Sequence, residues 1–273
     1  MYTFKPNRDS AGRNRYILED NQTGTKLSLT GMTTILGVVD KPYLVNWAAK
    51  LAYQDAMAFV KDFKKDISML DVSQLLDKAE DHIQIVLAEG EYAHTKKSGE
   101  ALDKGSEAHA EVEAFIKNYI KNKNYDYIIK SYDAGVKISV QRFIDWAKKE
   151  NVEFYSSEES VYSEVHLVAG SYDFVCKING EWYVGDFKTS KQIDDTYHIQ
   201  CAGYGLLINE RKGTDRKWNT IIVRSTLSKD DNVYYQKGTK YPKKIVQPAF
   251  EISIHKEDEY ERDLKFFFSC LYI

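Results

Sequence analysis

Three charged side chains are candidates for a catalytic or metal-binding site because of their types and spacing: Asp173, Asp186 and Lys188. They lie in stretches that are otherwise apolar and aromatic, where a charge is costly unless it serves a ligand. Two carboxylates repel each other when they are close, and a bound divalent cation would remove that repulsion. The residue types therefore predict a metal site, provided that the fold brings the three side chains together.

A β-hairpin is expected to bring them together. Residues 171–178 and 181–188 are rich in aromatic and branched side chains, which is typical of strands. Between them, Asn179-Gly180 is the strongest short-range signal for a two-residue hairpin turn, because both positions tolerate positive φ.

The turn predicts the register of the two strands. Ile178 is expected to pair with Glu181, which places Asp186 close to Asp173 on the neighbouring strand. Side chains alternate between the two faces of a strand, so Asp186 and Lys188 point the same way. The hairpin therefore predicts one patch that contains two carboxylates and one ammonium group.

A helix is predicted after the hairpin, and Asp194 or Asp195 can cap its start. Gln200 and Tyr204 are four positions apart, so they share one face of this helix. His198 lies close to Gln200 in sequence, but we interpret it as a packing or surface histidine rather than as a ligand.

An upstream helix is predicted over residues 106–121, with Ser106 as its cap and His109 in its first turn. Apolar residues follow His109 at helical spacing and are expected to pack on the sheet: Val112, Ile116 and Ile120. We therefore expect the His109 ring to reach the same site as the two aspartates.

These motifs, in this order, resemble the PD-(D/E)XK nuclease superfamily, and within it the RecB-like and phage-type exonuclease branch, which includes mitochondrial genome maintenance exonucleases. The resemblance touches positions from about 32 to about 208, and it rests on Asp173, Asp186-x-Lys188, Gln200-x-x-x-Tyr204, Gly105-x-x-x-His109 and residues 32–47. The proline that precedes the first aspartate in the superfamily is Tyr172 here.

The resemblance implies a role for each matching residue. Asp173 and Asp186 would ligate the metal, with the Phe187 carbonyl and His109 as further members of the site. Lys188 would orient the attacking water and stabilise charge on the phosphate.

Supporting or DNA-contacting roles would fall to Gln200, to Tyr204 and to an auxiliary acidic residue. Glu159 is the predicted acidic residue, and Glu158 is adjacent to it. Among several basic groups, Lys96 and Lys97 are the nearest in sequence to a site residue, so they are favoured for phosphate contact.

Composition limits the class of protein. The chain has 273 residues and 43% hydrophobic residues, which allows a substantial core in one elaborated domain or two small ones. No apolar run suggests a membrane span, and the first residues do not resemble a signal peptide.

Three cysteines are too few for the four-cysteine iron–sulfur subclass, and they favour a reducing, cytoplasmic setting in a bacterial or phage-infected cell. The net charge of −3 does not exclude nucleic-acid binding, because the local potential decides it.

The expected architecture is α/β: a PD-(D/E)XK core, with a mixed central sheet flanked by helices, and an N-terminal helical elaboration. We place the boundary between residues 1–100 and residues 101–273. The predicted elements are strands within 1–30, a helix from Pro42, helices near 73–89, 106–121 and 134–149, strands within 159–188, a helix over 194–209, a strand near 218–227, a loop or irregular hairpin over 228–247, a strand near 249–254 and a closing helix.

The resulting expectation is a Mg²⁺-dependent DNA exonuclease in which Mn²⁺ can substitute, acting in phage or bacterial DNA recombination, repair or processing. Its expected partners are DNA and a single-strand annealing or other recombination protein. Two alternatives stay open. One is an endonuclease of the structure-specific or restriction type with the same core, and the other is a catalytically silent nucleic-acid-binding module.

Overall fold

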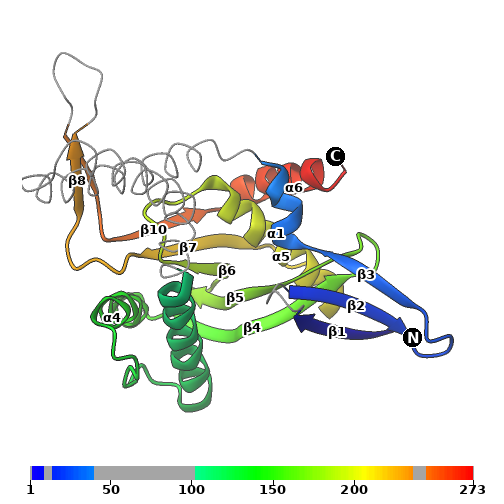
Figure 1. Cartoon of the computed structure of the whole chain (residues 1–273), viewed down its shortest axis with the longest axis horizontal. Helices are drawn as coiled ribbons and strands as arrows, with labels where there is room; N and C mark the ends of the chain where they lie inside the picture. Colours follow the sequence, from blue (N-terminus) through cyan, green and yellow to red (C-terminus); the bar gives the residue numbers. More distant parts are fainter. Residues whose placement is uncertain (1, 9–13, 40–101, 236–243, 273) are drawn as a thin grey trace, which may run out of the picture. The chain divides into compact units, whose positions relative to one another are not determined.

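The computed structural model describes residues 2–8, 14–39, 102–235 and 244–272 (Figure 1). The chain divides into two compact units, one of Met1–Val39 with Gly105–Ile273 and one of Asp40–Lys104. One border, between Lys104 and Gly105, is close to the boundary suggested near residue 100, whereas Met1–Val39 falls in the same unit as Gly105–Ile273. The physical reason is strand pairing, because β3 (Lys26–Gly31) extends the sheet beside β5 (Val168–Ile178). The predicted helices from Pro42 and near 73–89 lie outside the described residues.

One mixed sheet organises this unit. Its strands run in the order β1-β2-β3-β5-β6-β7-β10, and β4 pairs with β5 off this path. The pairs β3–β5 and β6–β7 are parallel, and the other pairs of the sheet are antiparallel. The remaining bounds are β1 Tyr2–Arg8, β2 Asn14–Asp20, β4 Glu153–Ser163, β6 Glu181–Lys188, β7 Asn219–Ser225 and β10 Phe250–His255.

Helices cover both faces of the sheet (Figure 1). The helix over residues 102–122 and α4 (Ala134–Lys149) pack on one face, around buried aromatic residues that include Phe115, Phe143 and Phe187. The other face carries α1 (Met32–Ile35), the short helix η1 (Leu36–Val38), α5 (Asp195–Lys212) and α6 (Glu257–Leu271). The described unit is therefore a mixed α/β fold of three layers, with an apolar core on each side of the sheet.

Local sequence explains where two of these helices begin. Asp133 caps α4 by accepting hydrogen bonds from the backbone N–H groups of Gly135 and Val136. Asp194 caps α5 by accepting the N–H of Thr196, so the choice between two capping aspartates falls on the first. The helix near His109 differs from its prediction, because it already includes residues 102–105 and Ser106 lies inside it rather than at its start.

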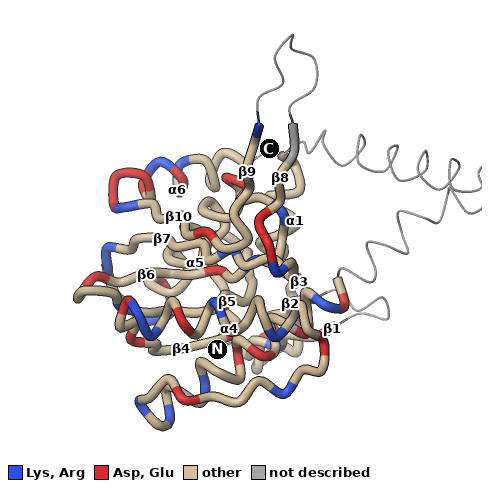
Figure 2. The backbone as a smooth tube through the Cα atoms, turned by 90° about the vertical axis from the view of Figure 1, so that its left-hand side faces the viewer, with Lys and Arg blue, Asp and Glu red and all other residues tan. Residues whose placement is uncertain are grey.

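The segment predicted as a loop or irregular hairpin contains a hairpin in its described part. β8 (Asn232–Tyr235) and β9 (Lys244–Gln247) pair as a separate two-stranded ribbon, while residues 236–243 lie outside the described residues. Basic and acidic residues are interspersed along the backbone of this unit (Figure 2). Within the described ranges, no helix has both the length and the apolarity that a membrane span requires.

Candidate functional site

The predicted hairpin is present with the predicted register. Ile178 pairs with Glu181, and the ladder between β5 and β6 ends at Phe174 and Gly185. Both turn residues have positive φ, 51° at Asn179 and 85° at Gly180, which is why this dipeptide favours the turn.

The site forms at the point along β5 where its pairing with β3 has ended and its pairing with β6 begins. β3 pairs with β5 only at residues 168–169, and β6 pairs with it from Phe174 onward. The edge of β5 between these two ladders ends at Asp173. Its carboxylate oxygen Oδ2 accepts the backbone N–H of Phe187 at 2.8 Å, so a side chain takes the place of a ladder hydrogen bond.

His109 reaches Asp173 from the helix on the opposite side of the sheet from α5. Its Nδ1 lies 3.2 Å from Asp173 Oδ2, and its ring meets the Phe187 ring edge-on at 5.2 Å between centroids. The structure thus brings His109 and Asp173 together, as the sequence predicted. Gly105 lies near the end of β6 as well, since a Cβ at this position would be in tight contact, at 3.2 Å, with Oγ1 of Thr189, the residue after Lys188.

Asp186 and Lys188 form a buried ion pair on β6. Nζ of Lys188 donates a hydrogen bond to Asp186 Oδ1 at 2.7 Å and lies 2.6 Å from Oδ2 without hydrogen-bond geometry. Among the described residues, no donor forms a hydrogen bond with Asp186 Oδ2, although this oxygen is buried. The Lys188 ammonium also lies 5.0 Å from the centre of the Tyr197 ring on α5.

A third carboxylate joins the site, and it is Glu158 rather than the predicted Glu159. One ligand atom each from His109, Glu158 and Asp173 lies within 4.8 Å of the others. Glu159 instead accepts a hydrogen bond from the Tyr172 hydroxyl at 2.7 Å. Asp186 is not part of this three-residue group, so the site consists of the group and the neighbouring Asp186–Lys188 pair.

The register between β4 and β5 explains why Glu158, and not Glu159, approaches Asp173. Ser157 pairs with Phe174 and Glu159 pairs with Tyr172, so Glu158 lies opposite Asp173 on the neighbouring strand. Residues directly opposite each other in an antiparallel pair carry their side chains on the same face. The φ of 53° at Glu158 marks a local irregularity within this ladder.

The pKa values of the site show competition between carboxylates. Burial raises the pKa of Asp186 to about 6, with Lys188 opposing the rise and Asp173 adding to it. Loss of solvation and the charge of Asp173 raise the pKa of Glu158 to about 7, although part of its side chain is exposed. Two carboxyl groups with raised pKa values beside a third carboxylate are expected where a cation is missing.

The pKa values of His109, Asp173 and Lys188 shift toward the charged form of each group, in contrast to those of Asp186 and Glu158. Burial alone would lower the pKa of His109, but the charge of Asp173 and a hydrogen bond to it outweigh burial, so this pKa lies above its ordinary value. The same contacts hold the pKa of Asp173 below its usual range in spite of burial. Burial opposes the charge on Lys188, yet Asp186 and Asp173 raise the pKa of Lys188, so it stays an ammonium group at neutral pH.

Gln200 and Tyr204 line the α5 side of the sheet and contact each other. Nε2 of Gln200 donates to the Tyr204 hydroxyl at 3.1 Å. Tyr204 is buried against Gly170 of β5, where a Cβ would lie 2.7 Å from its ring. Tyr204 thus packs α5 onto the strand that carries Asp173.

Two residues of the site were missed by the sequence analysis, Glu158 and Tyr197. Tyr197 lies three positions before Gln200 and seven before Tyr204, so helical spacing could have indicated it. The position of Glu158 opposite Asp173 depends on the register of β4 against β5, which has no comparable local signal. Lys96 and Lys97 lie outside the described residues.

The donor set fits a hard divalent cation. Carboxylate oxygens from Asp173, Asp186 and Glu158 are typical ligands of Mg²⁺, and the imidazole of His109 is compatible with Mn²⁺. The crowding of carboxylates supports a cation most directly, because the pKa values of Asp186 and Glu158 are raised even though Lys188 already contacts both oxygens of Asp186.

No protein-family model matches the chain, and no curated protein matches its sequence. Among solved structures, the chain is similar to a crystal structure from Eubacterium rectale that is described as a putative exonuclease. The two share 12% sequence identity with a TM-score of 0.37, over 60% of this chain and 63% of that chain. The chain therefore matches less than two thirds of that protein's length, and a similarity this distant determines neither fold nor function.

Proposed function

We propose that this chain is a metal-dependent nuclease that hydrolyses phosphodiester bonds in DNA. The observation that carries the proposal is the convergence of ligand atoms from His109, Glu158 and Asp173 within 4.8 Å of one another, beside the Asp186–Lys188 ion pair. Carboxylates crowded in this way repel one another, and a bound divalent cation would remove the repulsion. Asp173 and Asp186 supply two anionic ligands, and Lys188 supplies a cation that can face a phosphate.

Four groups would hold the metal in this proposal. They are the carboxylates of Asp173, Asp186 and Glu158 together with the imidazole of His109, and the Phe187 carbonyl is a fifth candidate from the sequence. A bound Mg²⁺ or Mn²⁺ would lower the pKa of a coordinated water and neutralise charge on the scissile phosphate.

Lys188 has the positioning and stabilising role. Its ammonium group is fixed by Asp186 before any substrate binds, and Tyr197 lies over the same group. A preorganised cation of this kind orients a water molecule and stabilises the negative charge that develops on the phosphate. His109 orients the Asp173 carboxylate, and so does the N–H group of Phe187.

An exonuclease is the activity we favour, and the motive is the resemblance in sequence at Gly105-x-x-x-His109 and over residues 32–47. The charged residues alone would serve an endonuclease equally well. A silent binding module is disfavoured because both aspartates and Lys188 are retained together.

The experiment compares linear with closed circular DNA in the presence of Mg²⁺. We expect the chain to degrade end-labelled linear DNA and to leave a relaxed closed circle intact. Asp186→Asn should abolish degradation, whereas Asp215→Asn, on an exposed loop, should leave it unchanged. Efficient nicking of the circle would favour the endonuclease, and DNA binding without Mg²⁺-dependent turnover would favour the binding module.

A further inference from the structure

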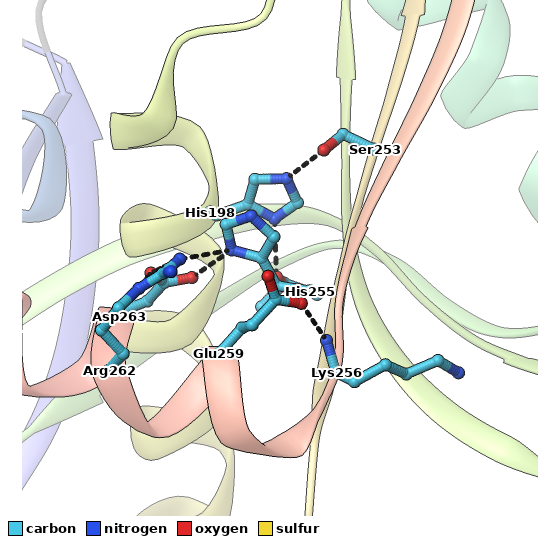
Figure 3. Close-up of polar contacts among 8 residues, drawn as sticks. His198, Ser253, His255, Lys256, Glu259, Arg262 and Asp263 are labelled. Carbon is cyan, nitrogen blue, oxygen red and sulfur yellow. Dashed lines mark hydrogen bonds and ion pairs between the residues drawn. The ribbon is translucent and has the colours of Figure 1, made fainter.

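A second group of histidines and a carboxylate lies at the junction of α5, β10 and α6 (Figure 3). One ligand atom each of His198, His255 and Asp263 lies within 4.8 Å of the others. His255 and Asp263 also line an open cavity of about 680 Å³. By residue types alone, this group could be read as a metal site.

The pairing of β7 with β10 builds the surface on which His198 rests. Thr220 and His255 are partners across the two strands, and Ser253 precedes His255 by two positions, so all three side chains face α5. Nδ1 of His198 lies 2.7 Å from Oγ1 of Thr220, and its Nε2 lies 2.8 Å from Oγ of Ser253. Both ring nitrogens of His198 are therefore occupied by hydroxyl groups.

The second ring is stacked on the first. The centroids of His198 and His255 are 3.6 Å apart, and their planes differ by 13°. His255 Nδ1 lies 2.5 Å from Asp263 Oδ2 and 3.4 Å from a guanidinium nitrogen of Arg262, which also donates to Asp263 Oδ1 at 3.0 Å (Figure 3).

Three features of this geometry are unfavourable for a metal ion. An imidazole binds a metal in the plane of its ring, and two stacked parallel rings direct their lone pairs side by side rather than toward one point. The two nitrogens of His198 already have hydroxyl partners. Arg262 places a positive charge next to His255 and Asp263, where it would repel a cation.

We propose that His198 and His255 form a proton-sensitive latch, which joins α5 to β7, β10 and α6 while His198 is neutral and opens when His198 takes up a proton. The proposal does not rest on the function proposed for the site around Asp173 and Asp186. The latch and that site are connected by α5, which carries Gln200 and Tyr204 as well as His198.

The charges that face His198 explain why it stays neutral. Arg262 and His255 are the positive or titratable groups on that side, and the nearest carboxylate, Asp263, is engaged by both of them. Glu259 accepts the backbone N–H of Lys256. Two further carboxylates, Asp194 and Asp195, belong to the start of α5 and line the cavity.

The remaining contacts of the His198 ring are neutral. Thr220 of β7 and Ser253 of β10 offer only hydroxyl groups. A proton on His198 would therefore place a desolvated charge next to Arg262 and the His255 ring, while Asp263, the carboxylate grouped with His198, is already engaged by both of them.

The direction of the pH effect follows from this environment. Burial first, and then His255 and Arg262, lower the pKa of His198 to about 3 from its ordinary value of 6.5. A histidine with a lowered pKa in the folded state contributes stability above about pH 6.5, and this contribution is lost as the pH falls toward 3. Acid therefore opens the latch and base closes it.

Two matched variants test the latch by urea unfolding of the full chain. His198→Asn removes the titrating ring but keeps a polar group that can meet one of the two hydroxyls. His166→Asn serves as the control, because His166 lies away from the latch, beside Glu210 and Tyr272. Between about pH 7.5 and about pH 5.5, we expect the unfolding equilibrium constant of the wild type to rise by about tenfold more than that of His198→Asn. The control should follow the wild type, and equal pH dependence of the wild type and His198→Asn would refute the latch.

A second measurement needs no variant to fold. In an NMR titration of the wild-type histidine rings, the His198 ring should stay neutral to below about pH 5, and titration near its ordinary value would overturn the proposal. Zinc titration of the wild type and of His198→Asn tests the alternative that His198, His255 and Asp263 form a metal site. Indistinguishable zinc binding supports the latch, and tight binding that is lost in His198→Asn contradicts it.

Discussion

The site around Asp173 and Asp186 and the latch around His198 and His255 contain the same kinds of side chain. Each has a carboxylate beside a histidine, and each has a long cationic side chain close by. They differ in how completely the polar atoms are paired. In the latch, both nitrogens of His198 meet hydroxyls, whereas at the other site a buried Asp186 oxygen has no hydrogen bond from a described residue.

The electrostatic consequences are opposite. At the latch, positive neighbours and burial keep His198 neutral, and its pKa is lowered to about 3. At the other site, burial and neighbouring carboxylates raise the pKa values of Asp186 and Glu158 to about 6 and about 7. Counting possible ligands would select both groups as metal sites, but crowded carboxylates with raised pKa values distinguish the group around Asp173 and Asp186.

The largest expected effect is that of Asp186→Asn. Removing this ligand should lower Mg²⁺-dependent DNA hydrolysis by roughly 10³-fold, because the amide can no longer hold the cation or neutralise Lys188. Hydrolysis rates of the variant and of Asp215→Asn, measured side by side with circular dichroism as the folding check, provide the test. A wild-type rate in Asp186→Asn would remove Asp186 from the site.

Lys188→Met should have the next largest effect. We expect a fall in turnover on the order of 10²-fold with metal affinity retained, because the ammonium faces the water and phosphate rather than the cation. The variant leaves Asp186 without its ammonium partner, so added Mg²⁺ should raise the melting temperature of the variant more than that of the wild type. If the variant loses metal affinity and rate in equal measure, Lys188 is structural.

The adjacent glutamates offer a matched pair that separates the observed site from the one expected from sequence. Glu158→Gln should reduce hydrolysis by about tenfold, the scale of losing a group that supports a metal ligand set. Glu159→Gln should leave the rate near that of the wild type, because Glu159 contacts Tyr172 instead. The opposite ranking in a kinetic assay would return the auxiliary role to Glu159.

The smallest effect concerns pH. Protons compete with the cation for Asp186 and Glu158, whose pKa values are raised to about 6 and about 7. Mn²⁺ affinity should therefore be highest above about pH 7 and fall by up to about tenfold per pH unit below it. Mn²⁺ titrations followed by electron paramagnetic resonance would measure this slope, and an affinity independent of pH between 8 and about 5.5 would contradict it.

Short-range signals in the sequence predicted much of the fold around the site. Asn179-Gly180 predicted the hairpin with its register, and the bounds of α4 are those expected from its apolar spacing. These features depend on a few neighbouring residues, so their physical causes are visible in the sequence. The choice between Glu158 and Glu159 could not be made in this way, because it depends on the register of β4 against β5, which only the folded sheet sets.

Long-range pairing explains what else was missed. The surface that receives His198 exists because Thr220 and His255 meet across two strands that are far apart in sequence. The start of the His109 helix was also misplaced, since Ser106 has the type of a cap but lies inside the helix. Gly105 has its role in the contact with Thr189, which only the folded chain reveals.

One measurement tests the contrast between the two groups most directly: the anomalous difference map of a crystal of the full chain soaked in Mn²⁺ near pH 8. The account predicts a peak at Asp173 and Asp186, within reach of His109 and Glu158, and no peak at His198 and His255. A peak between His198, His255 and Asp263, or the absence of any peak at Asp186, would contradict it.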